Sequence, residues 1–401
     1  MELVKLEMTP KEIAYARGEE VDRIPTSLSA GETAPPLYGI SIRDYYFSAD
    51  AMVEVESRLA EDFQADNMGM GLGLRTLVEA LGTKLEYPEH SVSYIEKPAL
   101  ETFDDLDHME LINVEKDGRF PIIIEAFERL QEKYGKERGI GSGLAGPFTT
   151  AASLIGTETF LKGTVKHKEQ AHKLLQYSTD CVVKCCEDLH RKLGIGFTLS
   201  EPMGSRDLLS KRQFKEFFVP YIKQAVERMN KFQGSTGIHI CGHTRDRWEE
   251  VIGTGVSGFW VDNCESIQEL KECYGDKVAI SGNVPPVDVL KNGTFEEIDQ
   301  AIKKCIIEAG DNPRGYNLCP GCTTPVDTTK DGSLSKRSST ASNQAFGKLC
   351  EFVMDKVKEY GNEIIDGHIS LEPYKMGNAM YMYGIPVGEE QRLRCFYSAF
   401  F

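Results

Sequence analysis

Short strand-like segments alternate with helical segments along most of this 401-residue chain. A buried parallel strand is typically a short apolar run bounded by glycine or other turn residues. Eight such runs occur, at residues 24–27, 65–68, 139–144, 196–200, 237–241, 258–262, 278–282 and 315–318. Eight strands that alternate with helices are the number that closes a (β/α)8 barrel. We therefore expect an α/β protein with a TIM barrel.

An open, doubly wound sheet is the alternative architecture. Its dinucleotide-binding form needs a G-x-G-x-x-G turn after the first strand, and none follows residues 24–27. Helix starts agree with the alternating pattern. Thr294 with Glu297, and Ser266 with Glu269, have the spacing of capping boxes, and the apolar face of residues 294–309 has helical periodicity.

The pattern predicts one catalytic barrel domain over residues 1–361. This domain includes a short N-terminal helical extension, which begins at Thr9 and Pro10 and comes before the first strand of the barrel. Residues 328–340 are polar and predict either a mobile lid or a surface insertion. Residues 362–401 are rich in aromatic side chains and form a separate C-terminal extension. An end this apolar is expected to pack on the barrel or on a second subunit, which leaves a homodimer open.

Composition narrows the class of protein. The net charge of −16 argues against a nucleic-acid partner, which would require clustered lysine and arginine. No apolar run is long enough to cross a membrane, and the first residues lack the apolar stretch of a secretory signal. The 11 cysteines show no disulfide spacing, so we expect reduced thiols and a cytoplasmic location.

His239 and Cys241 stand two residues apart in the predicted strand 237–241, so both side chains point to the same face. Cys322 follows the last predicted strand, in the turn Pro320-Gly321-Cys322. In such barrels the carboxyl ends of the strands meet at one rim, where active sites form. Three nitrogen and sulfur ligands at that rim suit zinc and leave a fourth position open.

Other polar residues end strands at the same rim. Glu201 and Asp262 are candidate catalytic residues, and Asp262 could instead cap a helix, orient His239 or serve as a fourth ligand. Asn283 is a candidate cofactor-binding residue that could equally pin a loop. Cys319 is the rival of Cys322 as a ligand, and His243 is expected to lie in a loop.

Several short motifs together resemble the uroporphyrinogen decarboxylase superfamily. They are the segments 18–25 (GEEVDRIP), 146–149 (GPFT), 201–203 (EPM), 207–210 (DLLS), 217–221 (FFVPY) and 282–286 (GNVPP). The resemblance covers roughly residues 10–361. True decarboxylases carry an arginine motif just after the first strand, whereas residues 26–32 here contain no arginine. The His239-x-Cys241 motif with the later Pro-Gly-Cys322 instead resembles the zinc-dependent corrinoid methyltransferases of that superfamily.

The resemblance implies a corrinoid protein as partner and cobalamin as the cofactor that it carries. One reaction in that branch moves a methyl group from a small methylated substrate, such as an aryl methyl ether, to cobalt(I). The long insertion and the aromatic C-terminal extension favour this reaction. Its associated pattern, Glu-x14-Glu-x20-His, is met in part, because Glu201 and Glu216 are separated by 14 residues but Glu216 and His239 by 22.

The alternative reaction moves a methyl group from a methylcorrinoid to a thiol such as coenzyme M. In either reaction zinc would act as a Lewis acid. Three further classes stay open: a metal-free decarboxylase of the same fold, a thiol enzyme that uses Cys319 and Cys322 as a C-x-x-C pair, and a non-catalytic binding protein.

Overall fold

The computed structural model describes residues 26–29, 31–325, 352–353, 355–356, 359 and 396–400. The helix expected from Thr9, the 328–340 segment and most of the 362–401 extension lie outside these residues. The description therefore covers the rim of the expected barrel and the cavity within it.

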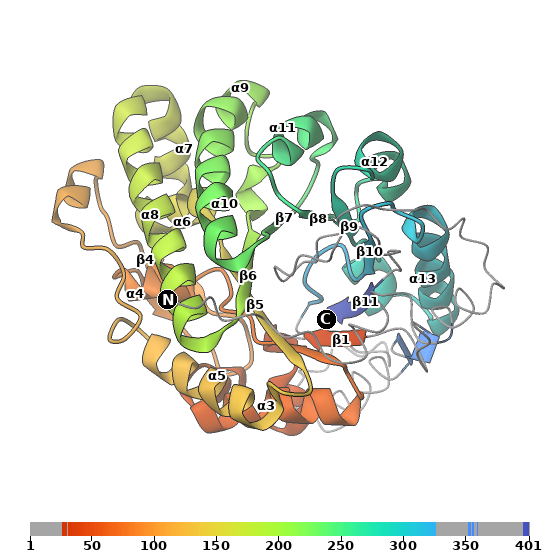
Figure 1. Cartoon of the computed structure of the whole chain (residues 1–401). Helices are drawn as coiled ribbons and strands as arrows, with labels where there is room; N and C mark the ends of the chain where they lie inside the picture. The colour runs from red at the N-terminus through yellow and green to blue at the C-terminus, as the bar shows by residue number, and fades with distance from the viewer. Residues whose placement is uncertain are drawn as a thin grey trace.

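The parallel strands close into a barrel surrounded by helices (Figure 1). Its strands are β1 (Thr26–Ser29), β2 (Asn67–Gly69), β5 (Gly139–Ala145), β6 (Gly196–Ser200), β7 (Gly237–Ile240), β8 (Gly258–Val261), β9 (Ala279–Ser281), β10 (Tyr316–Leu318) and β11 (Phe396–Phe400). Each of the eight predicted strands is present with bounds close to those expected, so the barrel prediction is confirmed.

The barrel contains one strand beyond the eight expected, because β11 is inserted between β10 and β1. Ser398 pairs with Ser27 of β1, and Tyr397 pairs with Leu318 of β10. Figure 1 shows β11 beside β1, although the two come from opposite ends of the chain. A strand whose pairing partners are so distant has no local signal beyond its own apolar residues. The division of the chain into domains at residue 361 stays a prediction.

Helices cover the outside of the barrel (Figure 1). They are α2 (Ile42–Phe47), α3 (Ala49–Asp62), α4 (Thr76–Ala80), α5 (Phe120–Tyr134), α6 (Pro147–Ile155), α7 (Thr157–Lys166), α8 (Lys168–Leu193), α9 (Lys211–Gln213), α10 (Val219–Gln233), α11 (Trp248–Ile252), α12 (Ile267–Tyr274) and α13 (Phe295–Ala309). Short 3₁₀ turns are η1 (Gly31–Thr33), η2 (Pro35–Tyr38), η3 (Phe103–His108), η4 (Pro202–Gly204) and η6 (Arg245–Arg247), and η5 (Phe214–Phe218) and η7 (Pro286–Lys291) are π-helical.

The loop between α4 and α5 contains an antiparallel hairpin of β3 (Lys84–Glu86) and β4 (Tyr94–Lys97). No helix within the described ranges is long and apolar enough to cross a membrane.

One of the two predicted capping boxes forms in full. Thr294 accepts a hydrogen bond from the backbone N–H of Glu297, whose carboxylate accepts one from the N–H of Thr294. Ser266 caps α12 in the same way, but the carboxylate of Glu269 instead pairs with Arg245. A side chain that can reach an arginine forms the charged pair in preference to the bond that closes the box.

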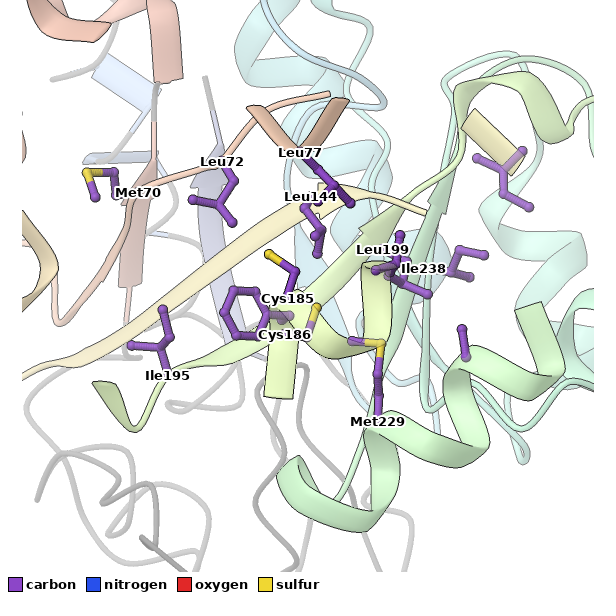
Figure 2. Close-up of a cluster of buried hydrophobic side chains, with 14 of the residues drawn as sticks. Met70, Leu72, Leu77, Leu144, Cys185, Cys186, Ile195, Leu199, Met229 and Ile238 are labelled. Atoms are coloured by element: carbon purple, nitrogen blue, oxygen red, sulfur yellow. The ribbon is translucent and has the colours of Figure 1, made fainter. Parts of the chain in front are cut away.

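Cysteines of α8 and α13 lie in the hydrophobic core. Figure 2 shows the side chains of Cys185 and Cys186, from α8, among apolar residues that include Leu144 and Leu199. Both thiols are fully buried, and burial raises the pKa of each. Cys181 and Cys305 are buried in α8 and α13, and the cysteines within the described ranges are all free thiols. These side chains act as small apolar residues.

Candidate metal centre

His239, Cys241 and Cys322 come together at the rim of the barrel. Their ligand atoms all lie within 4.8 Å of one another. His239 Nε2 lies 3.0 Å from Cys241 Sγ, and Cys241 Sγ lies 3.4 Å from Cys322 Sγ. The three residues form a compact cluster of one nitrogen and two sulfur atoms, which we call the sulfur–imidazole cluster.

Two segments of backbone supply the cluster. His239 belongs to β7, and Cys241 follows directly after it, so the alternation of the strand puts both side chains on one face. Cys322 arrives on the turn after β10, where Gly321 N–H donates to Val284 O at 2.9 Å. A β-carbon at Gly321 would overlap Asn263, so a residue without a side chain is needed there.

Trp260 of β8 holds both His239 and the turn that carries Cys322. Its backbone carbonyl lies 3.0 Å from His239 Nδ1, which makes Nδ1 the protonated nitrogen and directs the lone pair of Nε2 at Cys241. The rings of the two residues lie 4.1 Å apart, centroid to centroid. The indole N–H of Trp260 donates to Pro320 O at 2.7 Å, two residues before Cys322. One residue thus steadies both segments that supply the cluster, through its backbone carbonyl on β7 and through its indole on the turn of Cys322.

The donor set and its spacing fit zinc. Ligands that bind tetrahedral zinc at 2.0–2.3 Å lie roughly 3.5 to 3.8 Å from one another. The distances of 3.0 and 3.4 Å would need to lengthen by about half an ångström to reach these values. A backbone carbonyl that holds the second nitrogen of the histidine is also typical of such sites.

The two thiols of the cluster differ in acidity. Cys241 donates a hydrogen bond to the Cys322 sulfur, which, with His239 nearby, holds the pKa of Cys322 well below its usual range. The same interaction, together with burial, raises the pKa of Cys241. Cys322 is therefore the thiolate of the pair, and a thiolate is the form that binds metal.

A cavity of about 390 Å³ opens beside the cluster. All three cluster residues line it, together with side chains from the loop after β2 and from α2. Apolar residues form most of its wall, among them Met70, Leu72, Tyr45 and Trp260. An open ligand position on the cluster would therefore face a chamber of the size that binds a small molecule.

Glu201, a predicted catalytic residue, is fully buried and does not line the cavity. Its carboxylate accepts hydrogen bonds from the backbone N–H groups of Phe148 and Thr149, both at 2.8 Å, and from the Thr149 hydroxyl at 2.6 Å. Burial raises the pKa of Glu201 to about 7, although these hydrogen bonds oppose the rise. A β-carbon at Gly146 would overlap this carboxylate, which explains the glycine there. In this arrangement Glu201 joins the end of β6 to the start of α6.

Asp262 and Asn283 hold loops next to the cluster. Asp262 accepts hydrogen bonds from the backbone N–H groups of Gly242 at 2.9 Å and Cys264 at 3.1 Å. The Asn283 amide donates to the backbone carbonyls of Asp262 and Glu265. Neither side chain lines the cavity, and the orientation of His239, one of the roles considered for Asp262, is provided by Trp260 instead.

The remaining candidates lie away from the cluster. Cys319 is buried, and burial holds the pKa of its thiol well above the usual range, so a reactive pair with Cys322 is disfavoured. Glu216 lies in η5 and pairs with Lys168 at 2.6 Å. His243 is exposed in a loop beside Asp207, as expected.

Sequence reasoning missed Trp260 as a cluster residue. It is paired in register with His239 across β7 and β8. The position of Trp260 within a predicted strand was visible, but the register between two strands depends on their packing and not on either sequence alone.

The matched family is described as "Uroporphyrinogen decarboxylase (URO-D)", and its profile covers residues 9–333. The chain belongs to this family. A methylcobamide:CoM methyltransferase, MtbA, of Methanosarcina acetivorans is 28% identical over 348 residues, covering 85% of this chain and 99% of the relative. A methylated-thiol–coenzyme M methyltransferase of Methanosarcina mazei is 24% identical over 311 residues, covering 76% of this chain and 83% of the relative.

A solved structure of a methyltransferase from Methanosarcina mazei has the same fold, with a TM-score of 0.73 at 20% identity. The superposition covers 89% of this chain and 99% of that one. The chain is thus an enzyme that belongs with the methyltransferases of the family, as the sequence predicted.

Proposed function

We propose that this protein is a zinc-dependent methyltransferase that moves a methyl group from the corrinoid of a partner protein to a thiol. The main support for this proposal is the sulfur–imidazole cluster, which lies at the wall of the 390 Å³ cavity. The relatives that span nearly the whole chain are named for methyl transfer between a methylcobamide and the thiol coenzyme M. An enzyme of that reaction class needs a site that activates sulfur beside a chamber that admits the acceptor.

His239, Cys241 and Cys322 would hold the zinc ion. Zinc bound there would supply a Lewis acid that favours the thiolate form of the acceptor. The Trp260 carbonyl would keep His239 Nε2 facing the ion, since it fixes the proton on Nδ1. The apolar wall of the cavity would exclude water from the acceptor sulfur and raise its nucleophilicity.

In the transfer itself, the acceptor sulfur forms a bond to the methyl carbon as the bond between that carbon and cobalt breaks. The electron pair of the broken bond stays on the corrinoid, and the proton of the thiol passes to solvent. The corrinoid is too large for the cavity, so its carrier protein would dock on the rim of the barrel above the cluster.

The sequence favoured the demethylation of an aryl ether over methylation of a thiol, and we reverse that order. The glutamate pattern associated with ether demethylation does not supply ligands among the described residues. Glu201 binds the start of α6, and Glu216 pairs with Lys168. Thiol methylation needs neither residue.

The direct test is an assay with zinc-loaded protein and methylcobalamin in place of the partner. We expect a thioether to form from a small thiol. The methylcobalamin absorbance band should disappear at the same time. His239→Ala should abolish both signals, whereas Cys319→Ala, which alters a buried cysteine outside the cluster, should retain them.

Two outcomes would count against the proposal. One is thiol methylation that survives His239→Ala at the wild-type rate. The other is demethylation of an aryl methyl ether by cobalt(I) cobalamin without any thiol methylation, which would restore the direction that the sequence favoured.

A further inference from the structure

The sulfur–imidazole cluster contains two cysteines that are close enough to react with each other. The sulfur atoms of Cys241 and Cys322 lie 3.4 Å apart. A disulfide bond joins sulfur atoms at about 2.05 Å, so the pair would have to close by about 1.4 Å. Rotation of the two side chains can supply that movement, because the two sulfurs are already in contact.

The backbones that carry the two sulfurs are held by contacts that do not involve them. Cys241 directly follows β7, which is paired with β6 on one side and β8 on the other. Cys322 comes two residues after Pro320, whose carbonyl accepts the indole N–H of Trp260 at 2.7 Å. None of these contacts uses a cysteine side chain, so the two segments stay together when the bonds of the sulfurs change.

A small molecule in the cavity can reach both sulfurs. Cys241 and Cys322 are half-buried, and both line the 390 Å³ chamber. The exposed cysteines among the described residues are Cys264, in the loop after β8, and Cys273, in α12. The remaining cysteines of the described ranges are buried: Cys181, Cys185, Cys186, Cys305 and Cys319. The cluster pair thus combines access from the cavity with a second sulfur in contact.

We propose that Cys241 and Cys322 form a reversible disulfide when a peroxide enters the cavity, and that this disulfide expels zinc from the cluster. Disulfide sulfurs are no longer thiolates, which are the form that binds metal. His239 would be left as a single ligand, and one imidazole holds zinc weakly. The inference goes beyond the proposed function, because the disulfide requires neither a corrinoid nor an acceptor thiol.

The oxidation proceeds in two steps. One cysteine sulfur, as a thiolate, attacks an oxygen of the peroxide, the O–O bond breaks, and a sulfenic acid and a first water form. The second cysteine sulfur then attacks the sulfenic sulfur, the S–O bond breaks, and the hydroxyl leaves as a second water. The two cysteines together lose two electrons, and hydrogen peroxide is reduced to water. Solvent supplies protons where both sulfurs begin as thiolates.

The test adds hydrogen peroxide to the zinc-loaded protein and, in parallel, to protein stripped of metal with a chelator. A chromophoric chelator measures released zinc, and peptide mass spectrometry without reduction identifies linked cysteines. We expect the Cys241–Cys322 linked peptide in both samples. In the zinc-loaded sample, about one zinc ion should leave for each disulfide formed. Dithiothreitol followed by added zinc should restore the original zinc content.

Two variants separate the pair from other thiols. Cys264→Ser removes an exposed cysteine and should leave the linked peptide and the release of zinc as in the wild type. Cys241→Ser removes the partner of Cys322. In metal-free Cys241→Ser, peroxide should take Cys322 on to sulfinic acid, which dithiothreitol does not reverse. The free Cys322 thiol should therefore return after reduction in the wild type and not in this variant, and urea midpoints verify that both variants are folded.

Three results would overturn the inference. They are a linked peptide that joins Cys264 to either cluster cysteine in place of the expected pair, zinc loss without any linked peptide, and equal recovery of the Cys322 thiol in wild type and Cys241→Ser. The proposed function is judged separately. A protein that methylates no thiol refutes that function, whereas the linked peptide in the metal-free sample still decides whether the disulfide forms.

Discussion

The Cys241 sulfur lies 3.0 Å from Nε2 of His239 and 3.4 Å from the Cys322 sulfur, although Cys322 is 81 positions further along the chain. Cys241 thus stands at the centre of the cluster, between a ligand on its own strand and one from a distant turn. Its two neighbours in the cluster come from different parts of the barrel, because His239 lies in β7 and Cys322 in the turn after β10.

Zinc content should follow the cluster residue by residue. We expect about one zinc ion per chain in the wild type and little metal in Cys322→Ala, because two remaining ligands hold zinc weakly. Cys319→Ala is the matched control, since it removes a thiol three residues away that the cluster does not use. Mass-spectrometric metal analysis gives the ratio. Equal zinc in both variants would mean that Cys322 is not a ligand.

The two tryptophans of the chain offer a matched pair of substitutions. Trp260→Phe removes the hydrogen bond from the indole to Pro320 and frees the turn that carries Cys322. We expect zinc affinity to fall by about tenfold or more, as when other outer partners of metal ligands are lost. Trp248→Phe removes a comparable bond, to Thr244, in α11. Competition with a chromophoric chelator measures both affinities, and an equal loss in the two variants would assign the effect to stability alone.

Much of this arrangement was predictable from sequence, because it depends on local patterns. Strand periodicity placed His239 and Cys241 on one face, and the end of the last predicted strand placed Cys322 at the same rim. The roles of Glu201 and Trp260 were not predictable. A carboxylate at the end of a barrel strand can face the cavity or turn towards a helix, and the N–H groups of Phe148 and Thr149 that attract it lie 52 residues or more away in sequence. The pairing of β11 with β1 likewise depends on contacts between distant segments.

Cysteine labelling should depend on acidity more than on exposure. Cys264 and Cys273 are exposed, and burial of part of the Cys264 side chain together with Asp262 raises the pKa of that thiol to about 12. Cys322 is less exposed, but its pKa is held low by Cys241 and His239. In protein treated with a chelator, iodoacetamide at pH 6 should modify Cys322 first, because the thiolate is the nucleophile.

Peptide mass spectrometry reports the order of labelling, and added zinc should protect Cys322 while leaving Cys273 reactive. Faster modification of Cys264 than of Cys322 in the metal-free protein would contradict the predicted acidity of the pair.

Glu201 should make stability depend on pH, with a sign set by its raised pKa. The pKa is about 7 in the folded protein, against 4.5 for an unperturbed glutamate. Between these values the folded state keeps a proton that the unfolded state has lost, so this contribution is complete below about pH 4.5 and disappears as pH rises through about 7. The difference between these two values corresponds to about 3 kcal/mol, and it needs no discount for solvent because the group is fully buried. Urea unfolding of wild type and Glu201→Gln at pH 5 to 8 measures it. The glutamine cannot ionise, and both proteins keep the sulfur–imidazole cluster, so the difference in stability between them isolates Glu201.

We expect the wild type to lose stability relative to Glu201→Gln as pH rises. A difference that stays constant across this range, or that grows in favour of the wild type, would show that Glu201 is ionised in the folded protein and held as a carboxylate by Phe148 and Thr149.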